Sequence, residues 1–140
     1  IGLEGDHRMD NLLLKGSERF RKLVENAGGF VSSEWVAQLL EISEKDVRAL
    51  TLRNALIARR TASGELSFPR FQFGEPKGQV LAGLQTLLVE TASWVPEELI
   101  RFLLARHNPE HTDDTPLKML KRGDLHSVLH LASVHMEQRP

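Results

Sequence analysis

Apolar residues recur at helical spacing along the first part of the chain. From Asp10 onward they lie three, four or seven positions apart, as expected for one face of an amphipathic helix. Gly28 and Gly29 follow the last of them and predict the end of this helix. Gly16-Ser17 marks a point where the helix could divide in two. The residues on the predicted face are Leu13, Leu14, Phe20, Leu23, Val24 and Ala27.

Two short helices with capping signals are predicted next. Ser33 is a good N-cap for the first helix, because its hydroxyl can accept a hydrogen bond from the free amides of the following turn. Ser43, with Asp46 three positions later, resembles a capping box for the second helix. A tight turn at residues 41–43 between two capped helices is typical of a helix-turn-helix. The predicted buried positions are Val36, Ala37, Leu39 and Leu40, then Val47, Leu50 and Leu52.

The hydrophobic period changes after Asn54. Residues 56–60 and 66–68 read as two short strands on either side of a turn at residues 61–65, which contains glycine. A β-hairpin directly after a recognition helix indicates a wing. We expect the aromatic residues that follow to pack this hairpin against the helices, namely Phe68, Phe71 and Phe73.

The second half of the chain reads as a set of helices. Residues 74–78 are rich in turn formers and charge, which predicts a linker. Four helices are expected after it, covering Val80 to Leu88, Pro96 to Leu104, Thr115 to Arg122 and Leu125 to Met136. The predicted fold class is therefore mainly α. We expect a winged helix-turn-helix with one small β-hairpin over residues 9–73, followed by a small helical bundle over residues 74–140.

Composition narrows the class of protein. Hydrophobic residues make up 41% and charged residues 26% of the chain, close to the averages of globular domains. No apolar run approaches the roughly 20 residues that span a bilayer, and the first residues lack the order of a signal peptide, so we expect a cytoplasmic protein. We expect residues 1–8 to lie outside the fold, with Met9 as the natural start. The absence of cysteine excludes thiolate catalysis and cysteine-containing zinc sites.

The formal net charge of −1 conceals a basic middle segment. Residues 44–70 carry 6 basic and 3 acidic side chains, whereas residues 1–43 carry 5 and 7, and residues 71–140 carry 7 and 9. A helix-turn-helix needs exposed residues that reach base edges and nearby cations that bind phosphates. The candidates for DNA contact are Ser43, Lys45, Arg48, Arg53, Arg59 and Arg60, with Arg70 as a further cation.

An alternative for this segment is a helical hairpin with a solvated face. Glu44 and Asp46 favour it, because carboxylates at the start of the second helix repel phosphate.

Histidines are the candidates for a metal site. His107 and His111 are four positions apart, as are His126 and His130, and such a pair on one helix face can bind zinc. Pro109 places the first pair in a loop, and the chain contains no HExxH string. The sequence also lacks a Ser-His-Asp order and a phosphate-binding glycine loop. We therefore expect no metal, no cofactor and no catalytic residue.

A short string near the C-terminus is the most informative. Thr115 can cap a helix, Pro116 suits its first position, and Gly123 suits a left-handed stop. Together with Trp94, Phe102-Leu103-Leu104, Asn108-Pro109 and residues 68–73, the string Thr115 to Gly123 resembles the antitoxins with the Xre/MbcA/ParS toxin-binding domain. Residues 27–43 are also similar to the helix-turn-helix half of relatives of that family.

The resemblance implies that the protein is an antitoxin that binds a RES-domain toxin and represses its own operon. Toxins of this kind are enzymes that degrade NAD. It implies partner contacts in the last helix and tail, close to the toxin's active site. The candidate partner-binding residues are Thr115, His130, Met136, Gln138 and Arg139. The two-fold symmetry of helix-turn-helix proteins leads us to expect a homodimer. The alternative is a stand-alone transcriptional regulator without a toxin partner.

Overall fold

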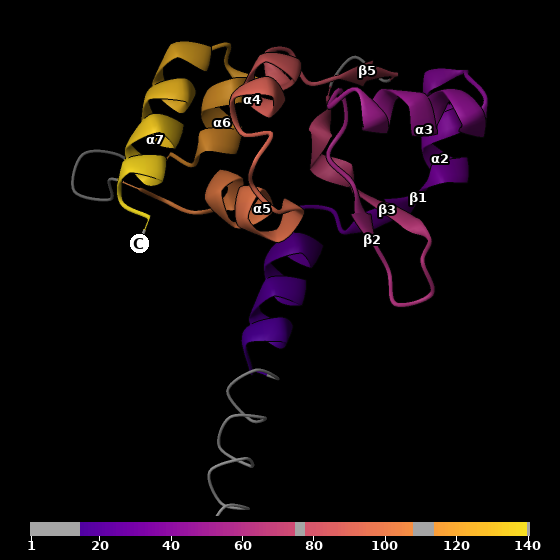
Figure 1. Ribbon diagram of the computed structural model, residues 1–140, viewed down its shortest axis with the longest axis horizontal. Coiled ribbons are helices and arrows are strands. Elements are labelled where there is room, and N and C mark those ends of the chain that lie inside the picture. Colours follow the sequence, from indigo (N-terminus) through magenta and orange to yellow (C-terminus); the bar gives the residue numbers. More distant parts are fainter. Residues whose placement is uncertain (1–14, 75–77, 108–113, 140) are drawn as a thin grey trace, which may run out of the picture.

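The computed structural model describes residues 15–74, 78–107 and 114–139. The fold is mainly helical with two small antiparallel sheets, which confirms the predicted fold class. A helix whose described part covers residues 15–26 projects from the middle of the molecule (Figure 1). In the view of Figure 1, the winged part lies to the right of this helix, α6 and α7 lie to its left, and α4 and α5 lie above it. Residues 1–14 fall outside the described ranges, and with them the expectations for Met9, Leu13 and Leu14.

The first half has the element order of a winged helix-turn-helix. The elements after the N-terminal helix are β1 (Phe30–Ser32), α2 (Ser33–Leu40), α3 (Glu44–Leu52), β2 (Arg59–Arg60) and β3 (Leu66–Pro69). Strand β3 lies between the other two, so that Ser67 is the register partner of both Ser32 and Arg59. The predicted hairpin is confirmed as β2 and β3, with β2 three residues shorter and β3 one residue longer than the sequence indicated. Strand β1 was not predicted.

Side-chain caps begin both helices of the helix-turn-helix. The hydroxyl of Ser43 accepts a hydrogen bond from the amide of Asp46 at 3.0 Å, as the sequence predicted. The cap of α2 is Ser32, whose hydroxyl accepts from the amide of Trp35 at 3.1 Å, so the prediction of Ser33 was wrong by one residue. Leu52, predicted as buried, is 84% exposed.

The second half begins with a small hairpin and continues as four helices. A 3-10 turn η1 (Arg70–Gln72) leads into β4 (Phe73–Gly74), which pairs with β5 (Gln79–Val80). The region predicted as a linker therefore carries a strand at each end. The helices are α4 (Leu84–Glu90), α5 (Pro96–Leu104), α6 (Pro116–Lys121) and α7 (Leu125–Glu137). Helix α4 starts four residues later than predicted, because Val80 belongs to β5 and Gly83 has a positive φ of 83°.

Two apolar clusters hold the fold together. The smaller one belongs to the winged part and centres on Val36, Val47 and Phe68. The larger one combines Phe20 and Val24 of the N-terminal helix with residues of α4 to α7. The larger apolar cluster therefore contains residues from both sides of the predicted domain boundary after residue 73. No helix in the described part of the chain is long and apolar enough to cross a membrane.

Candidate nucleic-acid interface and partner surface

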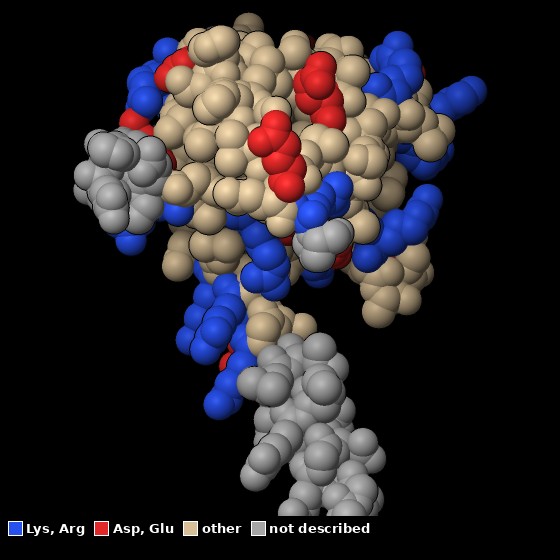
Figure 2. Space-filling model, turned by 60° about the vertical axis from the view of Figure 1, so that its left-hand side comes forward, with Lys and Arg blue, Asp and Glu red and all other residues tan. Residues whose placement is uncertain are grey.

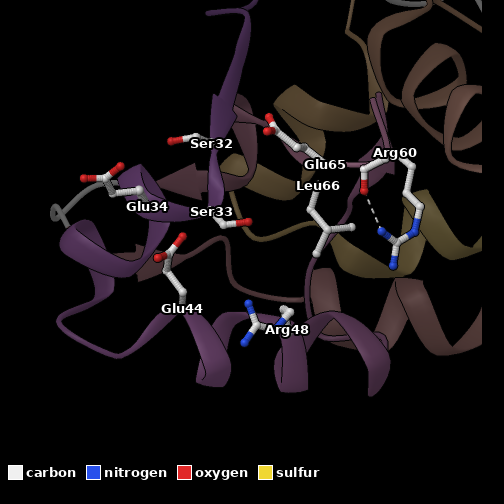
Figure 3. Close-up of a pocket in the computed structure, with 9 residues that line it drawn as sticks. Ser32, Ser33, Glu34, Glu44, Arg48, Arg60, Glu65 and Leu66 are labelled. Atoms are coloured by element: carbon white, nitrogen blue, oxygen red, sulfur yellow. Dashed lines mark hydrogen bonds between the residues drawn. The ribbon is translucent and has the colours of Figure 1, made fainter. Parts of the chain in front are cut away.

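A groove lies between the helix-turn-helix and the wing (Figure 3). Its walls come from the start of α2, from the exposed side of α3 and from the hairpin of β2 and β3 (Figure 3). The lining residues are Ser32, Ser33, Glu34, Glu44, Arg48, Arg60, Gly64, Glu65 and Leu66. The fold thus brings a predicted DNA-binding residue of the second helix, Arg48, to the same groove as one from the wing, Arg60.

The groove carries both signs of charge. Arg48 and Arg60 contribute two cations, and Glu34, Glu44 and Glu65 contribute three carboxylates. Arg60 donates a hydrogen bond through Nη1 to the carbonyl of Gly64 at 2.7 Å, which fixes its side chain along the wing. No ion pair among the described residues involves Lys45 or Arg48. These two exposed cations of α3 are therefore available to an anionic ligand.

The other predicted DNA-binding residues differ in their surroundings. The hydroxyl of Ser43 is engaged in the cap of α3, and Arg53 is exposed at the C-cap of the same helix. Arg70 lies with its guanidinium 5.4 Å from the centre of the Trp35 ring. This contact fixes Arg70 beside α2.

Arg59 does not line the groove. Its guanidinium lies over Phe30, 4.5 Å from the ring centre, and 5.5 Å from that of Phe20. Its Nη1 also lies 4.0 Å from a carboxylate oxygen of Glu97, at the start of α5. Arg59 therefore joins the winged part to the N-terminal helix and to α5. The sequence placed it with Arg60, but adjacent residues of a strand point to opposite faces.

The C-terminal tail is fastened to α5 by a polar cluster. Glu98 accepts hydrogen bonds from Nε2 of His135 at 3.2 Å and from Nε of Arg139 at 3.0 Å, and Nη2 of Arg139 binds its other oxygen. The guanidinium of Arg139 also lies 5.5 Å from the centre of the Trp94 ring. Arg139, predicted to bind a partner, thus has partners within its own chain.

Two carboxylates have lowered pKa values. Partial burial acts to raise the pKa of Glu98, but hydrogen bonds from His135 and Arg139, and their positive charge, outweigh burial and hold that pKa below its usual range. Hydrogen bonds from Ser127, whose amide lies 3.3 Å from Oδ1, lower the pKa of Asp124 at the start of α7. Both groups therefore stabilise the folded chain in their ionised form.

The remaining predicted partner-binding residues are spread over α6 and α7. Thr115 caps α6, because its hydroxyl accepts from the amide of Lys118 at 3.2 Å. His130 is exposed on α7, and Gln138 is exposed at the C-cap of that helix. Met136, 41% exposed, lines a shallow depression between α4 and α7. The other lining residues are Glu90, Leu129, Ala132, Ser133 and Glu137.

The face that carries α7 has few charges. Figure 2 shows it as a mostly uncharged surface with two acidic side chains in it. Lys and Arg side chains instead gather along the projecting N-terminal helix (Figure 2). The exposed cations of this helix are Lys15, Arg19, Arg21 and Lys22.

The histidines do not form a metal site within the described ranges. Nε2 of His107 bonds to the carbonyl of Phe102 at 2.8 Å, and His135 binds Glu98. Among the described residues, no three His, Asp or Glu side chains lie close enough together to bind one metal ion. His111 lies outside those residues.

Known protein families, curated proteins and solved structures were all compared with the chain, and none of them matches it.

Proposed function

We propose that this protein is a non-catalytic, antitoxin-like DNA-binding protein. The proposal of DNA binding rests on the order of elements in the first half of the chain, where a helix-turn-helix is followed directly by a β-hairpin wing. In such proteins the second helix of the motif enters the major groove, and flanking cations bind phosphates. Lys45, Arg48 and Arg53 of α3 and its C-cap, with Arg60 of the wing, are the residues proposed for this role.

Arg59 is left out of the proposed interface. Its guanidinium is engaged by two aromatic rings and by Glu97, so that it contributes to packing. Ser43 is retained as the cap that positions α3. The carboxylates of the groove oppose phosphate binding, and we therefore expect modest affinity with a clear dependence on salt. A role at a promoter would place the protein in the cytoplasm, where we expect it to act as a homodimer.

The partner-binding part of the proposal rests on the resemblance to antitoxins. The mostly uncharged face of α7 supports this part of the proposal. On this face Met136 is exposed and lines the depression between α4 and α7. Surfaces with few charges and an exposed apolar side chain are suited to protein partners. The proposed partner is a RES-type toxin, with His130, Met136 and Gln138 at the contact.

The proposed interaction is tested by co-expressing this protein with the protein that is encoded next to it in its genome. The proposal expects that the neighbour alone arrests growth, that the pair grows, and that the two proteins purify together. A Met136→Glu variant should weaken co-purification, whereas Leu52→Glu, on the other side of the molecule, should not. A neutral neighbour that fails to co-purify would contradict the antitoxin role. A chain that still binds DNA in that case would be a stand-alone regulator.

A further inference from the structure

One face of α3 is exposed and carries an unusual set of residues. Positions separated by three or four residues lie on the same side of a helix. Lys45, Arg48, Ala49 and Leu52 have this spacing, and all four are exposed. The opposite side carries Val47, which is fully buried and accepts at its carbonyl from the hydroxyl of Thr51 at 2.9 Å. The outward face thus combines two cations with a small and a large apolar side chain, and Glu44, which is exposed four positions before Arg48, adds a carboxylate to it.

We propose that Leu52 reads the methyl group of a thymine in the major groove, about two base pairs from a base that Arg48 contacts. This inference rests on the proposed DNA-binding function. Thymine is the base that presents a methyl group in the major groove, and guanine presents two acceptors that suit arginine. Leu52 lies one helical turn beyond Arg48, about 6 Å along the axis, which corresponds to roughly two base-pair steps.

The place of this face in the fold favours DNA as its occupant, because it belongs to the second helix of the helix-turn-helix and lies beside the wing. Lys45 and Arg48 lie on α3 and Arg53 at its C-cap, and no ion pair among the described residues involves these three cations. Arg60 adds a cation across the groove from Arg48 (Figure 3). An exposed apolar side chain on the same face as Arg48 fits a surface with a negative backbone and exposed methyl groups, although Glu44 offsets part of the positive charge. A second protein that covered Leu52 would have to bury these cations or supply carboxylates for them.

The experiment uses the full chain and a duplex enriched by it from a random-sequence DNA library. Each thymine of that duplex is replaced in turn by deoxyuridine, which removes the methyl group and leaves base pairing unchanged. The expected result is a three- to fivefold loss of affinity at one thymine per half-site, the factor expected for one methyl group that is no longer buried. In the Leu52→Ala variant that loss should vanish.

Val89→Ala is the matched control, because Val89 is 62% exposed on α4 and lies outside α3. This variant should discriminate thymine from deoxyuridine as the unaltered chain does. Equal affinity for every substituted duplex, or discrimination that persists in Leu52→Ala, would overturn the proposal while leaving DNA binding intact. A library that yields no bound duplex at low salt would overturn the proposed function itself, and this inference with it.

Discussion

Gln72 is the buried polar side chain on which the winged part depends most. It is 0% exposed, and its amide group bonds to the backbone at both ends. Its Oε1 accepts from the amide of Ile57 at 2.7 Å, and its Nε2 donates to the carbonyls of Ile57 and Pro69 at 2.8 and 3.0 Å. The residue thus ties the segment before the wing to the segment after it. Buried backbone groups of this kind need such partners, because water cannot reach them.

Replacement of Gln72 by leucine should therefore destabilise the protein strongly. Leucine keeps most of the volume but leaves three backbone groups without their partner, and we expect a loss of about 3 kcal/mol in the free energy of unfolding. Gln85→Leu is the control, since Gln85 is exposed on α4. Urea denaturation of both variants measures the difference. Equal stability of the two variants would show that these hydrogen bonds are not important.

Arg59 should behave as a packing residue and not as a DNA-binding residue. We expect Arg59→Ala to lower the free energy of unfolding by about 1–2 kcal/mol, because it removes a cation held over two aromatic rings. Its affinity for DNA, measured well below the melting temperature, should stay within about twofold of the unaltered chain. Arg60→Ala should show the reverse pattern. A large loss of DNA affinity in Arg59→Ala would contradict this prediction and show that Arg59 contributes to DNA binding.

Glu98 should make stability depend on pH in the acid range. Its pKa is lower in the folded chain than in the unfolded chain, so its contribution is present above the unfolded pKa and is lost as the pH falls through the folded pKa. The unaltered chain should therefore lose melting temperature between about pH 5 and pH 3. The Glu98→Gln variant should have a lower melting temperature than the unaltered chain at pH 7, and its melting temperature should fall less over the same acid range. Asp124 contributes with the same sign in both proteins. Parallel curves for the two proteins would contradict this role.

At the scale of the elements, the start of α4 depends on a glycine. Gly83 has a φ of 83°, and a Cβ there would lie 3.2 Å from Cδ1 of Leu125 and 3.5 Å from Cδ2 of Leu120. Gly83→Ala should therefore destabilise the protein by about 2 kcal/mol, through backbone strain and displacement of these leucines. Gly16→Ala is the matched control, because nothing lies within 4 Å of its added Cβ and the site is helical.

The control should itself be stabilising by up to about 1 kcal/mol, since alanine favours the helix over glycine. Thermal melts of the two variants give the comparison. A Gly83→Ala variant that melts with the unaltered chain would mean that α4 can shift away from the leucines.

The sequence predicted the elements whose signals are local. Ser43, Pro96 and Thr115 each begin a helix, because capping and the first helical turn depend on a few neighbouring residues. Strand β1 was missed because three residues are too short to show alternation, and pairing with β3 is what makes them a strand. The role of Arg59 was missed because it depends on contacts with residues that are far away in the sequence. Phe20, Phe30 and Glu97 are distant in sequence and meet only in the folded chain.

In the whole molecule, the two surfaces proposed for DNA and for a partner protein belong to one connected fold. The larger apolar cluster joins the N-terminal helix to α4 through α7, and Arg59 links the winged part to it. The α3 face lies in the winged part, and the exposed face of α7 lies in the helical bundle. We therefore expect surface substitutions to separate DNA binding from partner binding, as long as they do not alter the shared apolar cluster.

We propose above all that the winged part binds duplex DNA through α3 and the wing. The most direct test measures binding of the full chain to the DNA upstream of its own gene across a range of salt concentrations. We expect the affinity to fall steeply with salt, and Arg48→Ala and Arg60→Ala each to reduce the slope by about one. Lys118→Ala, an exposed cation on α6, should leave it unchanged. Flat, negligible binding at low salt would contradict the account.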